Sequence, residues 1–168
     1  MIFVVQGTYA VSSNPDEVIQ TLLGSCVATC LYDPVAKVGG LNHYLLSGEN
    51  QVSNNSLSYG TNAMEMLING LMKLGARRER LQAKLFGGAS MMAAGRDIGL
   101  QNGEFGKRFL ERERIALIST SLGGKQARKI RMIPTTGHVQ QMMVQDAVPL
   151  IVQKPAAARQ PVDDLELF

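Results

Sequence analysis

The feature that most constrains the fold of this chain is a pair of β-leaning runs around a short turn segment. Residues 26–32 read CVATCLY, Asp33-Pro34 follows, and residues 38–46 read VGGLNHYLL. Runs rich in β-branched and aromatic residues, separated by turn formers, are typical of antiparallel strands. We therefore expect a β-hairpin here, and the rest of the chain has to supply a sheet and a core around it.

Further strands and two helices are predicted along the rest of the chain. Apolar residues recur at helical spacing over 61–74, where Gly75 is placed for a left-handed cap, and a second helix is expected over about 103–113 with Asn102 as its N-cap. We expect Gly87-Gly88 to mark a tight turn or a close packing contact. The remaining strands are predicted at residues 2–11, 81–86, 115–122, 128–133 and 138–145, and a turn around Pro134-Thr-Thr-Gly137 is expected to join the last two.

These elements sum to an α+β fold, with about seven strands and two or three helices in no strict βαβ order. The polar stretch 47–60 is expected to be a mobile surface loop. A length of 168 residues favours one domain, which we place at residues 1–149. Residues 150–168 contain two prolines and an alanine run and are expected to form a flexible C-terminal tail.

Composition and charge exclude several functional classes. The longest apolar stretches are far shorter than the roughly 18 residues that a membrane span needs, so no membrane insertion is expected. The N-terminus has no secretory signal pattern, which predicts a cytoplasmic protein with reduced cysteines. The formal net charge of +3 is modest, and with no tryptophan and 5% aromatic residues the chain has few platforms for base stacking. Nucleic acid is therefore not an expected partner.

The hairpin brings Cys26 toward His43 in two of three possible registers. A turn over residues 33–36 places the two residues directly opposite each other, with Cβ atoms about 5 Å apart, and a turn over residues 34–37 makes them diagonal neighbours on one face. The intermediate register would place them on opposite faces. The sequence leaves the register open, and the pairing is a hypothesis at this point.

A thiol beside an imidazole has a chemical use as a nucleophile and its base. An imidazole that takes the proton of Cys26 makes the sulfur a far better nucleophile, and the resulting imidazolium can protonate a leaving group. Gly24 and Ser25 precede Cys26 and could give substrate access or backbone N–H groups for an oxyanion. A buried structural cysteine is the more common role at such a position. Because Cys26 and Cys30 lie about 13 Å apart on an extended strand, neither a disulfide between them nor a zinc site is expected.

The motif TLLGSCVATCLYDP at residues 21–34, followed by GGLNH at 39–43, resembles the chemoreceptor glutamine deamidase family, CheD. The resemblance continues through AKLFGGASM at 83–91, IGLQN at 98–102 and GGKQAR at 123–128, and it covers about residues 4–145. It implies a layered α/β/β fold similar to bacterial toxin deamidases. It also implies hydrolysis of glutamine side chains in the cytoplasmic domains of chemotaxis receptors, with no cofactor and no metal.

The resemblance also implies a Cys-His-Thr constellation. Cys26 matches the family nucleophile and His43 the family histidine. Thr21 is the expected orienting residue, because its hydroxyl can accept the second imidazole N–H. Other family members carry the threonine six positions before the cysteine, where this chain has Gln20, so Gln20 remains an alternative. Two competing functions share this motif: a chemotaxis adaptor that binds receptors or a CheC-type phosphatase, and a receptor methylesterase that uses the same thiol.

Overall fold

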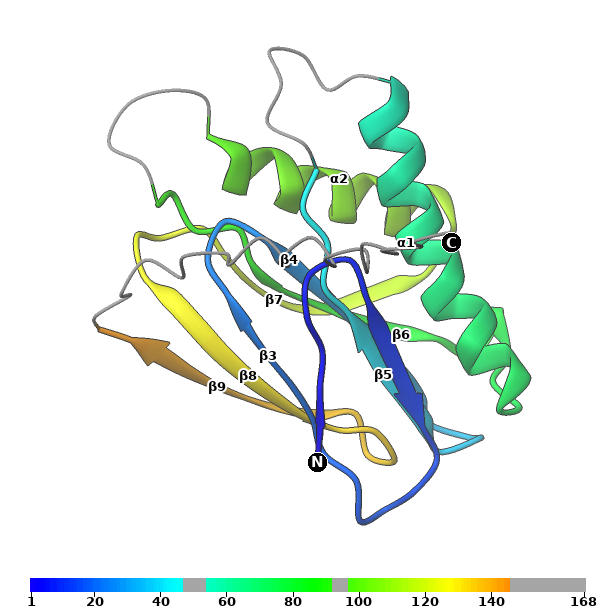
Figure 1. Ribbon diagram of the computed structural model, residues 1–168. Coiled ribbons are helices and arrows are strands. Elements are labelled where there is room, and N and C mark those ends of the chain that lie inside the picture. The colour runs from blue at the N-terminus through cyan, green and yellow to red at the C-terminus, as the bar shows by residue number, and fades with distance from the viewer. Residues whose placement is uncertain (47–53, 92–96, 146–168) are drawn as a thin grey trace, which may run out of the picture.

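The computed structural model describes residues 1–46, 54–91 and 97–145 of the chain. It contains two β-sheets and two α-helices, which confirms the α+β class (Figure 1). The first sheet has the strand order β1-β3-β8-β9, with β1 (Ile2–Phe3), β3 (Ile19–Leu23), β8 (Ala127–Ile133) and β9 (His138–Val144). The second sheet has the order β2-β5-β4-β6-β7, with β2 (Tyr9–Ser12), β5 (Val38–Asn42), β4 (Val27–Asp33), β6 (Gln82–Gly87) and β7 (Ala116–Leu122).

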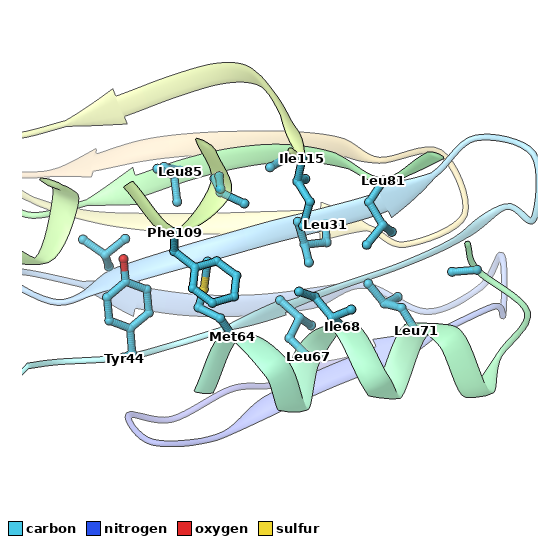
Figure 2. Packing of buried hydrophobic residues seen from close by; sticks show 14 of the residues in the cluster. Leu31, Tyr44, Met64, Leu67, Ile68, Leu71, Leu81, Leu85, Phe109 and Ile115 are labelled. Carbon is cyan, nitrogen blue, oxygen red and sulfur yellow. The ribbon is translucent and has the colours of Figure 1, made fainter. Parts of the chain in front are cut away.

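The helices and the two sheets form three layers, with the five-stranded sheet in the middle. Helices α1 (Asn54–Lys73) and α2 (Ile98–Arg112) cover one face of this sheet. Figure 2 shows the apolar side chains that pack between the helices and the sheet. A second cluster fills the space between the two sheets and includes Ile19 and Ile130 from one sheet and Leu41 from the other. The described residues therefore have the expected layering, and the central strands β4 and β5 are buried on both faces.

The β4–β5 hairpin is confirmed, and its register resolves the alternatives. Cys30 pairs with Leu41 and Asp33 with Val38, so the turn occupies residues 34–37. The Asp33 carboxylate accepts hydrogen bonds from the backbone N–H groups of Val35 and Ala36 and is paired with Arg80 of the short 3-10 helix at Arg78–Arg80. Although burial opposes ionisation of this carboxyl, its hydrogen bonds to Arg80 and to backbone N–H groups hold the pKa of Asp33 well below its usual range.

The prediction of a single strand over residues 2–11 was wrong. The chain turns at Gln6-Gly7, where the N–H and the hydroxyl of Thr8 both donate to the carbonyl of Val5. Gly7 has a φ of 83°, a conformation that glycine adopts without strain. The turn sends β1 to one sheet and β2 to the other. The strand β3 was not predicted, so the structure has nine strands in the described residues rather than about seven.

Both helices begin earlier than the sequence predicts. Residues 54–60 were expected to belong to a loop but form the first turns of α1, where Gly60 allows close contact with Phe105 of α2. Helix α2 begins at Ile98, and its N-cap is Asp97, whose side chain accepts from the N–H of Leu100. The predicted cap, Asn102, is instead a buried residue inside the helix. In both cases packing between elements outweighs the local signals on which the prediction relied.

Three glycine predictions are confirmed, and two predictions cannot be compared with the structure. Gly75 has a φ of 98° just after α1, Gly137 has a φ of 68° in the β8–β9 turn, and Gly87 has a φ of 111° in a close packing contact described below. The predicted loop at 47–53 and the predicted tail at 150–168 lie outside the described residues. The domain limits remain a prediction.

Candidate active site

A single backbone bridge beyond the hairpin brings Cys26 and His43 into register. The N–H of Val27 donates to the carbonyl of Tyr44 at 3.0 Å, and the N–H of Tyr44 donates to the carbonyl of Val27 at 2.9 Å. Cys26 and His43 each precede one member of this pair, which makes them diagonal neighbours. Val27 and Tyr44 point into the cluster under the helices, so Cys26 and His43 lie on the opposite face, toward the four-stranded sheet. The second of the predicted registers is therefore the one observed.

Thr21 fixes the ring of His43 from the neighbouring sheet. The Thr21 hydroxyl lies 2.9 Å from Nδ1 of His43 and 2.7 Å from the carbonyl oxygen of Val4. A carbonyl only accepts, so the single hydroxyl proton goes to Val4 and the Thr21 oxygen accepts from Nδ1–H of His43. Residues 19, 21 and 23 of β3 are buried and Gln20 is not, which directs Thr21 rather than Gln20 toward the histidine. The tautomer with the proton on Nδ1 leaves Nε2 as the basic nitrogen.

The basic nitrogen of His43 is buried and has no hydrogen-bond partner among the described residues. Burial lowers the pKa of His43 to about 4, against the opposing effect of the Val4 carbonyl. The imidazole is therefore neutral at pH 7. An unpartnered nitrogen lone pair in such a place is available to accept a proton from a neighbouring group.

Cys26 is a neutral thiol in the resting protein. Burial raises the pKa of Cys26 to about 11, although a hydrogen bond from its own backbone opposes the shift. The thiol donates to Oε1 of Gln6 over 3.6 Å. The other cysteine, Cys30, is buried in the cluster between the sheets, and both cysteines are free thiols, as the strand geometry predicted. Because thiol and imidazole are both uncharged, proton transfer between them has to accompany attack on a substrate.

The segment that carries Cys26 is held by three hydrogen bonds to its backbone carbonyls. Ala89 N–H donates to Gly24 at 2.9 Å, Gly88 N–H donates to Cys26 at 2.8 Å, and the Asn102 side chain donates to Ser25 at 2.8 Å. Within the described parts of the chain, the N–H groups of Ser25 and Cys26 donate to no acceptor outside their own residue. Two backbone donors next to a thiol are an arrangement that can bind a developing oxyanion.

The backbone of Gly87 lies so close to that of Cys26 that no side chain would fit at position 87. A Cβ atom at Gly87 would lie 2.2 Å from the carbonyl oxygen of Cys26, closer than any real contact. The Gly87-Gly88 pair therefore allows β6 to approach the backbone of the nucleophile. Gly24 faces Met91, whose Cγ lies 3.4 Å from the position of a Cβ at Gly24.

Sequence reasoning missed two residues at this site, Gln6 and Asn102. Gln6 was placed within a continuous strand, and the only local signal for a turn was Gly7. Asn102 was assigned to a helix cap. Because Asp97 caps the helix and α2 begins at Ile98, Asn102 lies inside the helix and not at its start. Both residues reach Cys26 or its neighbour through contacts between segments far apart in the sequence.

Other features of the described residues bear on the class of site. No group of three or more His, Cys, Asp or Glu side chains among them could hold a metal ion. No helix in the described part of the chain is long and apolar enough to cross a membrane. A groove of about 530 Å³ between α1 and α2 is lined by Phe105, Arg108 and other residues of the two helices and by Leu46, and its lining includes neither Cys26 nor His43.

The fold and this site define a mixed α+β protein with a cysteine, histidine and threonine gathered at one end of two packed sheets. The family model described as "CheD chemotactic sensory transduction" matches residues 45–143. The chain belongs to the CheD family.

Two curated relatives extend this match over nearly the whole chain. A protein of Caulobacter sp. (strain K31) is 45% identical, with 99% of this chain and 92% of the relative covered. A protein of Agrobacterium fabrum (strain C58 / ATCC 33970) is 46% identical, with 99% and 96% covered. Both are named "Probable chemoreceptor glutamine deamidase CheD". The alignments include the Cys26 region, which precedes the family match, and they reach beyond residue 145, where the motifs had predicted the resemblance to end.

Two solved structures are similar to part of the fold. The crystal structure of Bacillus licheniformis hypothetical protein YfiH has a TM-score of 0.46 and 14% identity, and the match covers 67% of this chain and 49% of that one. The Neisseria meningitidis protein NMB0706 has a TM-score of 0.45 and 9% identity, with 69% and 53% covered.

Proposed function

We propose that this protein hydrolyses specific glutamine side chains of chemotaxis receptors to glutamate, with Cys26 as nucleophile, His43 as base and acid, and Thr21 as the orienting residue. The observation that carries this proposal is the hydrogen bond of Thr21 to Nδ1 of His43, which leaves Nε2 basic and unpartnered among the described residues. The names of the relatives, at about 45% identity over nearly the full chain, support the substrate class.

The first half of the reaction forms a thioester. Nε2 of His43 takes the thiol proton as Sγ of Cys26 attacks the side-chain carbonyl carbon of the glutamine. The carbonyl oxygen becomes an oxyanion, which the N–H groups of Cys26 and Ser25 stabilise. The imidazolium then gives its proton to the amide nitrogen, the carbon–nitrogen bond breaks, and ammonia leaves. The nitrogen leaves as neutral ammonia, so the proton on Nε2 is essential to its departure.

The second half returns the thiol. Nε2 of His43, now neutral again, removes a proton from a water molecule as the water oxygen attacks the thioester carbon. The carbon–sulfur bond breaks, Sγ recovers a proton from the imidazolium, and glutamate is released. The chemistry uses this chain's own residues and water, with no cofactor. The added carboxylate changes the charge of the receptor.

The surroundings of Cys26 suit a protein substrate. Tyr59 of α1 and Met91 are exposed by 40% and 43% of their surface, and they lie beside Gly7 and Gly24. Exposed apolar side chains around a partly buried thiol favour docking of a glutamine that projects from a protein surface.

The similarity to bacterial toxin deamidases and binding of a CheC-type phosphatase remain predictions of the sequence.

The experiment that tests the proposal is peptide mass mapping of a receptor cytoplasmic fragment after incubation with the protein. Each converted glutamine adds about one dalton, because NH₂ is replaced by OH. We expect increments at discrete glutamines with the wild-type protein and none with Cys26→Ala. Cys30→Ala is the matched control, since Cys30 is the other free thiol, is fully buried away from the site, and is expected to leave the increments in place.

Three other outcomes would contradict the proposal. Receptor binding without any increment would favour an adaptor that uses the same surface. Conversion of methylated glutamates with release of methanol, and no change at glutamines, would favour a methylesterase. Full modification by Cys26→Ala would remove the thiol mechanism altogether.

A further inference from the structure

The turn between β1 and β2 presents Gln6 to the thiol of Cys26. The Thr8 N–H donates to the carbonyl of Val5, which closes a four-residue turn with Gln6 at its second position. Gly7, at the third position, has a φ of 83°, and its N–H donates to the carbonyl of His43 at 2.7 Å. The turn is thus anchored to the backbone of the histidine. The backbone geometry places an exposed glutamine directly beside the nucleophile.

The Gln6 side chain is a two-sided hydrogen-bonding group at this position. Its Oε1 accepts from Sγ–H of Cys26 over 3.6 Å. Its NH₂ group carries two donors, and these contact no acceptor in the parts of the chain that the structure describes. A carboxamide accepts from a neutral thiol on one side and offers N–H donors on the other. When Sγ loses its proton during attack, the N–H side is the one that suits the negative charge that develops.

We propose that Gln6 is a catalytic residue whose carboxamide N–H stabilises the oxyanion together with the backbone N–H of Cys26. This inference rests on the proposed deamidation. A carbonyl under attack by Sγ holds its oxygen within a few ångströms of the groups around the sulfur, and Gln6 is one of these groups. Donors aimed at the position of the developing charge act in the transition state and little in the ground state. The contribution of Gln6 should therefore be to kcat rather than to KM.

The test measures kcat and KM on the receptor fragment for Gln6→Met and Gln6→Glu. Methionine keeps the length of the side chain without its donors, and glutamate keeps its shape but only accepts hydrogen bonds at neutral pH. We expect each variant to lose about 10²-fold in kcat, with KM changed by less than about threefold. Glutamate also adds a negative charge beside the thiol and the imidazole, which moves the acid limb of the pH–rate profile upward. Because Gln6 is exposed, neither change should alter the thermal midpoint.

The matched control is Gln20→Met on β3, a glutamine whose side chain points away from the site, and we expect it to retain wild-type kcat. A kcat of Gln6→Met within twofold of wild type would overturn the proposal. A kcat above that of the wild type would also overturn it and would identify Gln6 as a competitor of the substrate. Failure of the wild-type protein to deamidate the fragment would overturn the proposed function itself, which keeps the two results separate.

A second, independent observation concerns Asn102, which is fully buried inside α2. Its side-chain NH₂ donates to the carbonyl of Ser25 at 2.8 Å, and its Oδ1 accepts from the N–H of Leu46 at 2.9 Å. Its own carbonyl accepts from the Tyr44 hydroxyl at 2.8 Å. One residue thus joins the segment before Cys26 to the segment after His43.

We infer that Asn102 is a positioning residue that fixes the separation of Cys26 and His43. Asn102→Asp keeps the acceptor toward Leu46 but loses the donor to Ser25, so the nucleophile segment is released while the other contact remains. We expect kcat to fall by about 10-fold to 100-fold with KM near wild type. The measurement is made well below the thermal midpoint of the variant.

Leu110→Ala supplies the comparison for loss of stability. Leu110 is buried on the same helix and belongs to the apolar cluster beneath it, which does not include Ser25. This variant is expected to lower the thermal midpoint and to keep kcat. If Asn102→Asp and Leu110→Ala lose kcat in the same proportion to their losses of stability, the role of Asn102 is structural only and the inference is overturned.

Discussion

Replacing Thr21 by valine tests the proposed site most directly, because valine has nearly the same shape and lacks only the hydroxyl. The hydroxyl makes two contacts, as donor to Val4 and as acceptor from His43, and Thr21 is fully buried. Leaving a buried polar group without its partner costs about 1–3 kcal/mol. We expect the free energy of unfolding to fall by about 2–3 kcal/mol on this basis.

The effect on the reaction follows from the tautomer of the histidine. Without the Thr21 oxygen, the ring proton has no acceptor at Nδ1, and the tautomer with the proton on Nε2 becomes competitive. Each 1.4 kcal/mol of lost preference reduces the productive population about tenfold, so kcat should fall by about 10-fold to 100-fold. The assay is the rate of receptor deamidation by mass spectrometry at pH 7, with protein that is fully folded.

Two further variants make the result interpretable. Thr21→Ser restores the hydroxyl and should recover most of the rate. Thr29→Val removes a hydroxyl that is also fully buried but contacts the sulfur of Met64, and it should keep the wild-type rate. The reasoning is refuted if Thr21→Val retains at least half of the wild-type kcat, or if Gln20→Leu abolishes the reaction and Thr21→Val does not.

Three other predictions concern stability. The pKa of His43 is about 4 in the folded protein against an ordinary value of 6.5, so on lowering the pH through this window the unfolded chain binds a proton that the folded one does not. Stability should fall by about 3 kcal/mol more between pH 6.5 and pH 4 in the wild type than in His43→Gln, measured by urea unfolding. Gly87→Ala should lower both stability and kcat, because its Cβ would meet the Cys26 carbonyl, whereas Gly75→Ala, with a φ of 98° and open space, should cost about 1 kcal/mol and no activity. Asp33→Asn should reduce the unfolding free energy by about 3 kcal/mol in chemical denaturation, because it removes the charge that holds Arg80, and an unchanged value would contradict the assigned role of this ion pair.

The sequence was sufficient for the elements whose signals are local. The hairpin around Asp33-Pro34, the end of the first helix before Gly75 and the β8–β9 turn all follow from turn-forming residues next to apolar runs. The register of the hairpin was left open because two turns of equal length were compatible with the same composition. The backbone pairing of Val27 with Tyr44 settled this choice.

The parts that sequence reasoning missed depend on contacts between distant segments. The break at Gln6-Gly7 is hidden in a run of β-forming residues, because a single glycine does not distinguish a turn from a bulge. The early start of α1 depends on packing of Gly60 against Phe105. The preference for Thr21 over Gln20 depends on which face of β3 is buried, and β3 itself was not predicted. Local propensities carry none of this information.

The high pKa of Cys26 has a consequence for the survival of the protein in an oxidising or electrophile-rich environment. With its pKa raised to about 11 by burial, the thiol is almost entirely protonated at pH 7. Peroxides and alkylating metabolites react with thiolates, so the resting sulfur is a poor target for them. Reactivity would develop only when a bound carboxamide draws the proton across to His43. Burial of the thiol thus keeps the sulfur protonated until substrate binds, and it favours reaction with the bound carboxamide over reaction with peroxides or alkylating metabolites.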